Sequence, residues 1–435
     1  MQSDVSIKRL KQFPRLMWIL LFGSFITRGS YYMVWPFLAV ILYEKFALSA
    51  TEIGLILTNA AIISVLVSFV GSLLSDRIGR KKLMYLSGVL YIISFSLLAE
   101  VTTVTGYVVV MTLCSIATAL WRPLVSALIG DIIDETETRE LAMQSLYFAV
   151  NVGCAIGPMV GVWMGLTGEQ SSFYLTAGAF AFLLVLLCWG FNHHQKLALD
   201  NEQARLDKEQ ALLSNTSNDV NDKDGEQASP KTSFHQTMRV LMHDKLLQVL
   251  IIANILCMFI YAQMDSSLIQ YLTRAEVPKL IELISSMIFA NALVIISTQF
   301  LLLKLMANMT LIKRIQLSLI LLMVSQVWLA LNPLDWFWGF ISAIIVMSLA
   351  EAILFPTMNV HIDRLAPQNL RGAYFGAASF YEIGYAFAPL GGGIILDLFG
   401  GFWLFMVAAA MALIVFYLYA NLEKMPRPDF DNLKI

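Results

Sequence analysis

The chain has 435 residues, of which 58% are hydrophobic and only 14% are charged, and its mean hydropathy is +0.70. A typical soluble domain has about 45–50% apolar and about 25% charged residues, so this composition excludes a water-soluble enzyme, a disordered scaffold and a nucleic-acid-binding protein. The 29 Lys and Arg residues against 31 Asp and Glu residues leave a net charge of -2, which offers no basic surface to an acidic polymer. We therefore expect an integral membrane protein.

Apolar segments of membrane-spanning length recur along the whole chain. A helix crosses the hydrocarbon core of a bilayer in about 20 residues. The first half contains six predicted spans, at residues 16–42, 52–75, 83–101, 106–131, 141–166 and 172–191. The second half contains six more, at residues 246–272, 281–303, 310–331, 336–361, 371–396 and 401–421. The expected fold class is therefore an all-α membrane protein with twelve transmembrane helices.

One long polar stretch divides these spans into two groups of six. We expect an N-terminal six-helix bundle at residues 1–191, a cytoplasmic linker at 192–245 and a C-terminal six-helix bundle at 246–435. The low hydrophobicity of the middle segment is typical of a flexible or weakly helical linker.

The distribution of basic residues predicts the orientation in the membrane. Lys and Arg gather in the N-terminal segment and around the connections that follow the second, eighth and tenth spans, whereas the connection after the third span has no charge. Because basic loops stay in the cytoplasm, we expect both termini on the cytoplasmic side of the cell (inner) membrane.

The sequence offers no sign of a metal site, a cofactor or an enzymatic centre. Each of the four cysteines stands alone in an apolar segment, without the paired spacing of a zinc site or a disulfide framework. No phosphate-binding G-x-x-x-x-G-K-[ST] loop occurs. We expect a transporter that binds no cofactor and does not hydrolyse ATP.

The two halves carry the same features at a nearly constant offset. Pro123 in the fourth span corresponds to Pro356 in the tenth, 233 residues later, and Pro158 in the fifth span corresponds to Pro389 in the eleventh, 231 residues later. Parallel repeats of this kind flank a central cavity in secondary transporters, and one half rocks against the other around a midplane site.

Residues 72–81, which read SLLSDRIGRK, resemble the signature loop G-x-L-x-D-R-x-G-R-K of the major facilitator superfamily. The resemblance implies two six-helix repeats around a cavity and a loop that closes the cytoplasmic gate by pairing with neighbouring helix ends. It implies gate roles for Asp76, Arg77, Arg80, Asp131 and Arg139.

Residues 151–161, NVGCAIGPMVG, resemble the fifth-helix antiporter motif of the drug:proton antiporter branch of that superfamily. The matching positions are Gly153, Gly157, Pro158 and Gly161. This resemblance implies proton-coupled export.

A second resemblance supports import. Arg28, Tyr31 and Tyr32 are similar to the Arg-x-x-Tyr-Tyr part of the first-helix motif in proton-coupled oligopeptide transporters. Gly23 and Ser24 stand in the region where that family has acidic residues before the arginine, which favours the exporter as the first interpretation.

Ionisable side chains inside predicted spans mark the candidate site, because each costs about 2.5–3.5 kcal/mol at a helix centre unless it faces a cavity or a partner. Five qualify: Arg28, Arg122, Asp265, Glu351 and Glu382. Four of them fall on the first, fourth, seventh and tenth spans, which line the cavity according to the superfamily resemblance.

The three carboxylates are the candidate proton-coupling groups, with Glu351 first, Glu382 second and Asp265 third. Desolvation favours the protonated form of a carboxylate and a nearby arginine opposes it, so either coupling or a locked ion pair with Arg28 or Arg122 is compatible with the pattern. The candidate substrate-cavity residues are Arg28, Tyr31, Tyr32, Arg122, Tyr261, Tyr381 and Tyr385. Aromatic walls accept apolar and cationic ligands, although packing alone is an alternative role for each tyrosine.

These patterns together predict a proton-coupled secondary transporter that exports small amphipathic molecules of the drug, peptide or siderophore type by alternating access. The alternative is a proton symporter that imports short peptides or another small nutrient. The expected partners are a small-molecule substrate, protons and membrane lipids, with no nucleic acid, and the expected state is a monomer.

Overall fold

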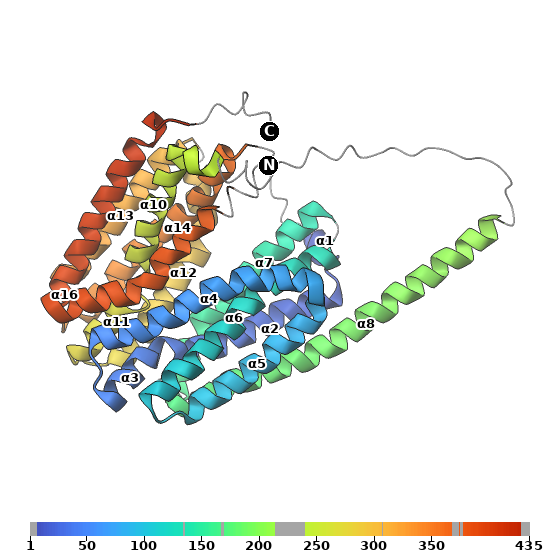
Figure 1. The fold of residues 1–435 in the computed structure, drawn as a ribbon, viewed down its shortest axis with the longest axis horizontal. Helices are drawn as coiled ribbons and strands as arrows, with labels where there is room; N and C mark the ends of the chain where they lie inside the picture. Colours follow the sequence, from blue (N-terminus) through green and yellow to red (C-terminus); the bar gives the residue numbers. More distant parts are fainter. Residues whose placement is uncertain are drawn as a thin grey trace.

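The computed structural model describes residues 7–133, 135–166, 169–213, 240–306, 308–367, 374 and 377–427. Every regular element in these residues is a helix. Eleven helical stretches are long and apolar enough to cross a membrane. The last of them, Ser379–Ala420, has 42 residues and a break at Gly400, whose φ of 82° lies in the left-handed region that favours glycine. The chain reverses direction there, so this stretch supplies two crossings, and the twelve-helix fold class is confirmed (Figure 1).

The first half contains the helices that follow from the first six expected spans. They are α1 (Ile7–Leu10), α2 (Arg15–Val34), η1 (Trp35–Phe37), α3 (Leu38–Phe46), α4 (Ala50–Ile78), α5 (Arg80–Glu100), α6 (Val104–Ile132), α7 (Thr136–Trp163), η2 (Gln170–Ser172) and α8 (Phe173–Leu213). The expected span 16–42 is interrupted by the 3₁₀ turn η1, where Pro36 has no backbone N–H to donate to the helix. Helix α8 has 41 residues and continues through residues 192–213 of the polar segment, whereas residues 214–239 lie outside the described residues.

The second half repeats the arrangement. Its helices are α10 (Lys245–Ala262), α11 (Ser267–Arg274), α12 (Leu280–Leu305), α13 (Leu311–Leu331), α14 (Phe337–Leu365), η4 (Ser379–Tyr381), α16 (Glu382–Ala420) and η5 (Leu422–Lys424). The expected span 246–272 is divided into α10 and α11 by a turn at residues 263–266. The start of the expected span 371–396 lies outside the described residues.

Matching glycines bring matching helices together in the two halves. A Cβ atom at Gly153 of α7 would meet the Phe25 carbonyl oxygen of α2, and one at Gly384 of α16 would meet the Ile255 carbonyl oxygen of α10. The two glycines are 231 residues apart and the two carbonyls 230, which is the offset of the sequence repeat. Small residues let helix backbones approach closely in membranes, so the repeat found in the sequence is also a repeat of packing.

The halves contact each other along α4 with α16 and along α7 with α12. Figure 1 shows that the two bundles converge at the end where α3 and α11 lie and diverge toward the opposite end. We call these the convergent end and the divergent end.

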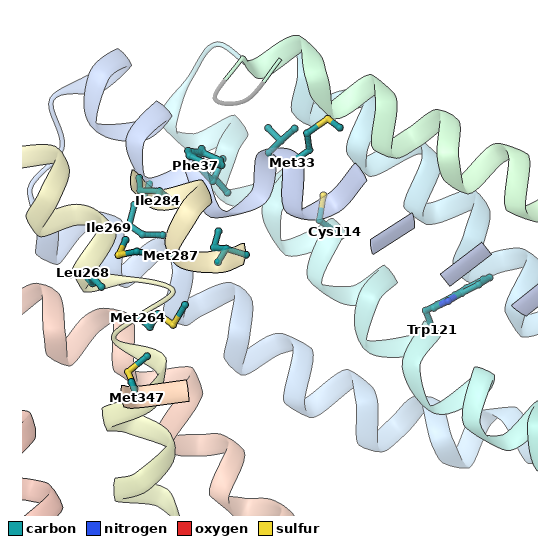
Figure 2. Close-up of a cluster of buried hydrophobic side chains, with 14 of the residues drawn as sticks. Met33, Phe37, Cys114, Trp121, Met264, Leu268, Ile269, Ile284, Met287 and Met347 are labelled. Carbon is teal, nitrogen blue, oxygen red and sulfur yellow. The ribbon is translucent and has the colours of Figure 1, made fainter. Parts of the chain in front are cut away.

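Buried apolar side chains fill the molecule near the convergent end. Figure 2 shows one cluster that draws Met33 and Phe37 from the first half and Leu268, Ile269 and Met287 from the second. Phe37 and Leu268 have no exposed surface. A cavity lies beside this packing, and polar side chains join the apolar ones in its walls.

Candidate functional site

A cavity with two lobes lies between the two halves. One lobe has a volume of about 460 Å³ and includes Asn151, Asn291 and Glu351 in its wall. The other has a volume of about 470 Å³ and includes Ser64 and Glu382. Five residues belong to the walls of both lobes: Arg28, Tyr32, Thr118, Tyr261 and Asp265. The lobes therefore adjoin at a wall that carries one cation and one carboxylate.

The glycines of the expected antiporter motif set the position of Arg28. A Cβ atom at Gly153 would lie 2.6 Å from the Phe25 carbonyl oxygen and 3.1 Å from Cβ of Arg28, and one at Gly157 would lie 2.9 Å from Cα of Gly29. Any larger residue would push α7 away from α2 at this level. Pro158 and Gly161 belong to the same helix, α7.

The Arg28 guanidinium lies over two aromatic rings of its own helix. Its central carbon is 5.5 Å from the centroid of Tyr31 and 5.9 Å from that of Tyr32, which is the distance of a cation–π contact. Tyr31 in turn stacks on Trp35, with ring centroids 5.0 Å apart. No salt bridge joins Arg28 to a carboxylate among the described side chains. A ligand anion in the cavity therefore has an available cation to bind.

Glu351, on α14, is held by a neutral amide. Asn291 of α12 donates from Nδ2 to Oε2 of Glu351 over 2.7 Å and also approaches Oγ of Ser348 at 3.0 Å. Ser348 donates its own hydroxyl to the Ile344 carbonyl, so this small network is anchored on the α14 backbone. Asn291 was not among the predicted site residues, and its only signal in the sequence is an amide within an apolar span.

Asp265 lies in the turn that separates α10 from α11. Tyr385 of α16 donates its hydroxyl to Oδ2 of Asp265 over 3.3 Å. Interrupted helices at the repeat interface supply binding groups in many transporters, because the interruption frees backbone and side-chain groups toward the cavity. Tyr261, four residues earlier, packs edge-on against Phe355, with ring centroids 5.1 Å apart.

Tyr381 ends η4 and Glu382 begins α16, and both belong to the wall of the second lobe with Tyr385. The described residues thus place Asp265, Glu351 and Glu382 on the wall of one two-lobed cavity, together with Arg28 and the tyrosines. Arg122 falls on α6, but its side chain lies outside the described residues.

Of the expected gate residues, Arg80, Asp131 and Arg139 have described side chains, and these lie outside the walls of both lobes. Arg80, at the start of α5, forms a salt bridge with Asp131 of α6 and donates to the Ala127 carbonyl over 2.9 Å. Arg139 of α7 donates from Nε to the Ile133 carbonyl over 2.9 Å. These contacts join helix ends within the first half. The side chains of Asp76 and Arg77 lie outside the described residues.

In the part of the chain that the structure describes, no group of three His, Cys, Asp or Glu residues could hold a metal ion.

The comparisons with known proteins agree with this architecture. The family model of the Major Facilitator Superfamily matches residues 20–382. The chain is 25% identical to the uncharacterized MFS-type transporter YqjV of Bacillus subtilis (strain 168), over 94% of this chain and 93% of that protein. It is also 25% identical to a Na(+), Li(+), K(+)/H(+) antiporter of Planococcus maritimus, over 94% of this chain and 96% of that protein.

A solved structure of a POT family transporter in complex with 5-aminolevulinic acid superposes with a TM-score of 0.71. It covers 94% of this chain and 97% of its own, at 17% sequence identity, which is a similarity of fold. The family and these relatives are transporters and not enzymes. The chain is a multi-pass membrane transporter for small molecules, and it belongs to the Major Facilitator Superfamily.

Proposed function

We propose that this protein is a proton-coupled antiporter that exports small amphipathic molecules of the drug, peptide or siderophore type by alternating access. The observation that carries the proposal is that Asp265, Glu351 and Arg28 face one cavity between two halves related by an internal repeat. The proposal includes both termini in the cytoplasm, a single chain as the working unit, and the polar segment 192–245 as a cytoplasmic linker between two six-helix bundles.

The surroundings of Glu351 support a role in proton transfer. Its hydrogen-bond partners in the structure, the amide of Asn291 and the hydroxyl of Tyr261, are both neutral, so the carboxylate can take up or release a proton without breaking an ion pair. One proton that crosses the membrane potential supplies about 2.3 kcal/mol per 100 mV, which is sufficient for modest uphill transport.

The cavity walls support an amphipathic substrate. Aromatic rings of Tyr32 and Tyr261 offer apolar and cation-binding surface to both lobes, and Arg28 offers a site for an anionic group. Antiport is also supported by the relative named as a cation/proton antiporter, and its monovalent cations therefore belong among the compounds to test.

Proton symport that imports short peptides is the alternative. It is favoured by the first-helix resemblance at Arg28, Tyr31 and Tyr32, all of which lie on the wall of the second lobe.

The test uses the purified full chain in liposomes of known orientation with a pH-sensitive dye inside. Cationic drugs, dipeptides, iron chelators and sodium ions are added singly to the outside with no initial proton gradient. Substrate entry with alkalinisation of the interior supports antiport, and the active compound identifies the substrate class. Entry with acidification shows symport and supports the alternative, whereas entry with no pH change contradicts proton coupling altogether.

A further inference from the structure

The N-terminus of α4 is only half capped by its own residues. The backbone N–H of Ser49 donates to Oε2 of Glu52 over 2.8 Å, and the N–H of Glu52 donates to Oγ of Ser49 over 3.1 Å. This reciprocal capping box satisfies two of the four N–H groups that a helix N-terminus leaves without an intrahelical partner. The N–H groups of Ala50 and Thr51 remain.

Asp397, from the other half of the molecule, accepts both of them. Ala50 donates its N–H to Oδ1 of Asp397 over 3.0 Å and Thr51 donates its N–H to Oδ2 over 2.7 Å. The Thr51 hydroxyl donates to the same Oδ2 over 2.6 Å. A carboxylate at this position also lies at the positive end of the α4 dipole. One side chain of α16 thus completes the cap of a helix that lies 346 residues away in the sequence.

The backbones of α4 and α16 touch beside this cap. A Cβ atom at Gly54 would collide with the Pro389 carbonyl oxygen, and one at Gly393 would collide with the Ala50 carbonyl oxygen. Leu390, which follows a proline inside α16, donates its N–H across the interface to Oγ1 of Thr58 over 3.2 Å. The helices are therefore in direct contact over about two and a half turns of α4, from its cap to Thr58.

A second contact closes the same end. Arg274, at the end of α11, donates from Nη2 to the Leu48 carbonyl over 2.8 Å. Its guanidinium carbon lies 4.8 Å from the ring centroid of Tyr43 on α3. Both partners belong to the first half, so Arg274 also joins the two halves at the convergent end.

We propose that Asp397 and the N-terminus of α4 form a latch that holds the convergent end of the transporter closed. The halves must separate at this end for the cavity to open there, and that separation breaks all three hydrogen bonds of Asp397. Asp397 is a positioning residue: it acts on the equilibrium between closed and open states of this end and does not line either lobe. The inference is independent of which substrate or ion the cavity carries.

The test measures how fast a cavity residue reacts with a membrane-impermeant maleimide added from the side of the convergent end. Ser64 of the second lobe is replaced by cysteine, with Cys154→Ser and Cys188→Ser to remove the thiols that line the cavity or are exposed. Cys114 and Cys257 have no exposed surface and stay in place as reporters of unfolding.

We expect Asp397→Ala to raise the labelling rate from the convergent side about tenfold, the size typical of the loss of a helix cap together with its charge. Asp397→Asn, which keeps one accepting oxygen but loses the charge, should raise it about threefold. Labelling from the divergent side should not rise in either variant. The matched control is Asp335→Ala, because Asp335 is an exposed carboxylate in the loop before α14 that has no part in the cap.

Equal labelling rates in Asp397→Ala, Asp335→Ala and the parent protein would overturn the latch. If Asp397→Ala makes Cys114 or Cys257 reactive, that variant has unfolded the protein. The test then uses Asp397→Asn and Thr51→Val, and an unchanged labelling rate of the Ser64→Cys thiol in both variants contradicts the proposal. The result does not depend on proton coupling or on substrate export, so failure of the latch and failure of the proposed function are distinguishable.

Discussion

The neighbours of each charged side chain decide what it can do in this cavity. Arg28 is stabilised by the faces of Tyr31 and Tyr32 instead of a carboxylate, and Glu351 is held by the amide of Asn291 instead of a cation. Because Arg28 and Glu351 do not form an ion pair with each other, Arg28 remains available to an anionic ligand and Glu351 remains available to a proton. This separation of charges is the basis of the two residue-level predictions.

Glu351→Gln should reduce proton-coupled transport to the background of empty liposomes and leave the fold intact, because glutamine keeps the shape of the side chain and its contact with Asn291 but carries no titratable proton. The measurement is the substrate-induced pH change, with size-exclusion chromatography as the check on folding. The matched control is Glu282→Gln in the first turn of α12, whose carboxylate is exposed and pairs with Lys279 over 3.6 Å. Proton-driven flux equal to that of the parent protein would remove Glu351 from the mechanism.

Arg28→Ala should weaken the binding of substrates that bear a carboxylate by about tenfold to a hundredfold, since a hydrogen bond to a charged group contributes about 1.5–3 kcal/mol. Substrates without an anionic group should lose much less. Titration of both kinds of substrate by calorimetry measures the difference, and Arg28→Lys is the control that keeps the charge. If the affinities for all substrates stay the same, Arg28 has only a structural role.

The sequence alone was sufficient to single out the charged residues of the site but not their partners. Arg28, Asp265 and Glu351 stand out because a charge is costly in an apolar span. Asn291 is neutral and costs less, so the pattern gives no reason to prefer it over other amides in the spans. Asp397 could not be assigned a role because its partners, Ala50 and Thr51, are adjacent to it only after the two halves have packed.

At the scale of the helices, hydropathy predicted the spans well and their interruptions poorly. The breaks at Trp35–Phe37 and at residues 263–266 lie inside stretches whose mean hydropathy is high enough for a continuous span, although Gln263 and Asp265 are polar, and hydropathy counts residues without regard to backbone angles. The first break contains Pro36, which is a visible signal. The second contains no proline or glycine, so tertiary packing decides where α10 ends.

The contact between α2 and α7 gives the element-level prediction. Gly157→Val places a branched side chain against the Gly29 backbone, because a Cβ atom at residue 157 would already lie 2.9 Å from Cα of Gly29. We expect this overpacking to lower the free energy of unfolding by about 1–3 kcal/mol. It should also weaken substrate binding, because Arg28 lies next to Gly29. The midpoint of thermal unfolding in detergent measures the first effect and a binding titration the second.

Gly178→Val is the matched control for that variant. Gly178 lies on α8, and a Cβ atom there would meet nothing within 4 Å. Equal midpoints for the two variants would show that the close approach of α2 and α7 does not limit stability.

At the scale of the whole molecule, α4 packs along the first part of α16, which runs from Glu382 to the break at Gly400, and this helix pair reaches both ends of the transporter. Helix α4 has 29 residues, about 43 Å at 1.5 Å per residue. Its first turn meets Asp397 at the convergent end, and Asp76 of the signature loop falls in its last turn, toward the divergent end. Each helix of the pair thus carries an aspartate near its own C-terminal end, and the two aspartates lie at opposite ends of the molecule.

This arrangement leads to a prediction for the second gate. Asp76→Asn should slow transport severalfold and change substrate affinity by less than about twofold, because a residue that acts only on the gate alters the equilibrium between conformations and makes no contact in the cavity. Turnover in liposomes and equilibrium binding in detergent are measured on the same preparation, with Asp335→Asn as the control for the loss of a peripheral carboxylate. In the labelling assay, the same variant should favour opening at the divergent end, so that the Ser64→Cys thiol reacts more slowly from the convergent side. A large loss of affinity without a change in labelling would instead place Asp76 in the binding machinery and leave Asp397 as the gate residue of this helix pair.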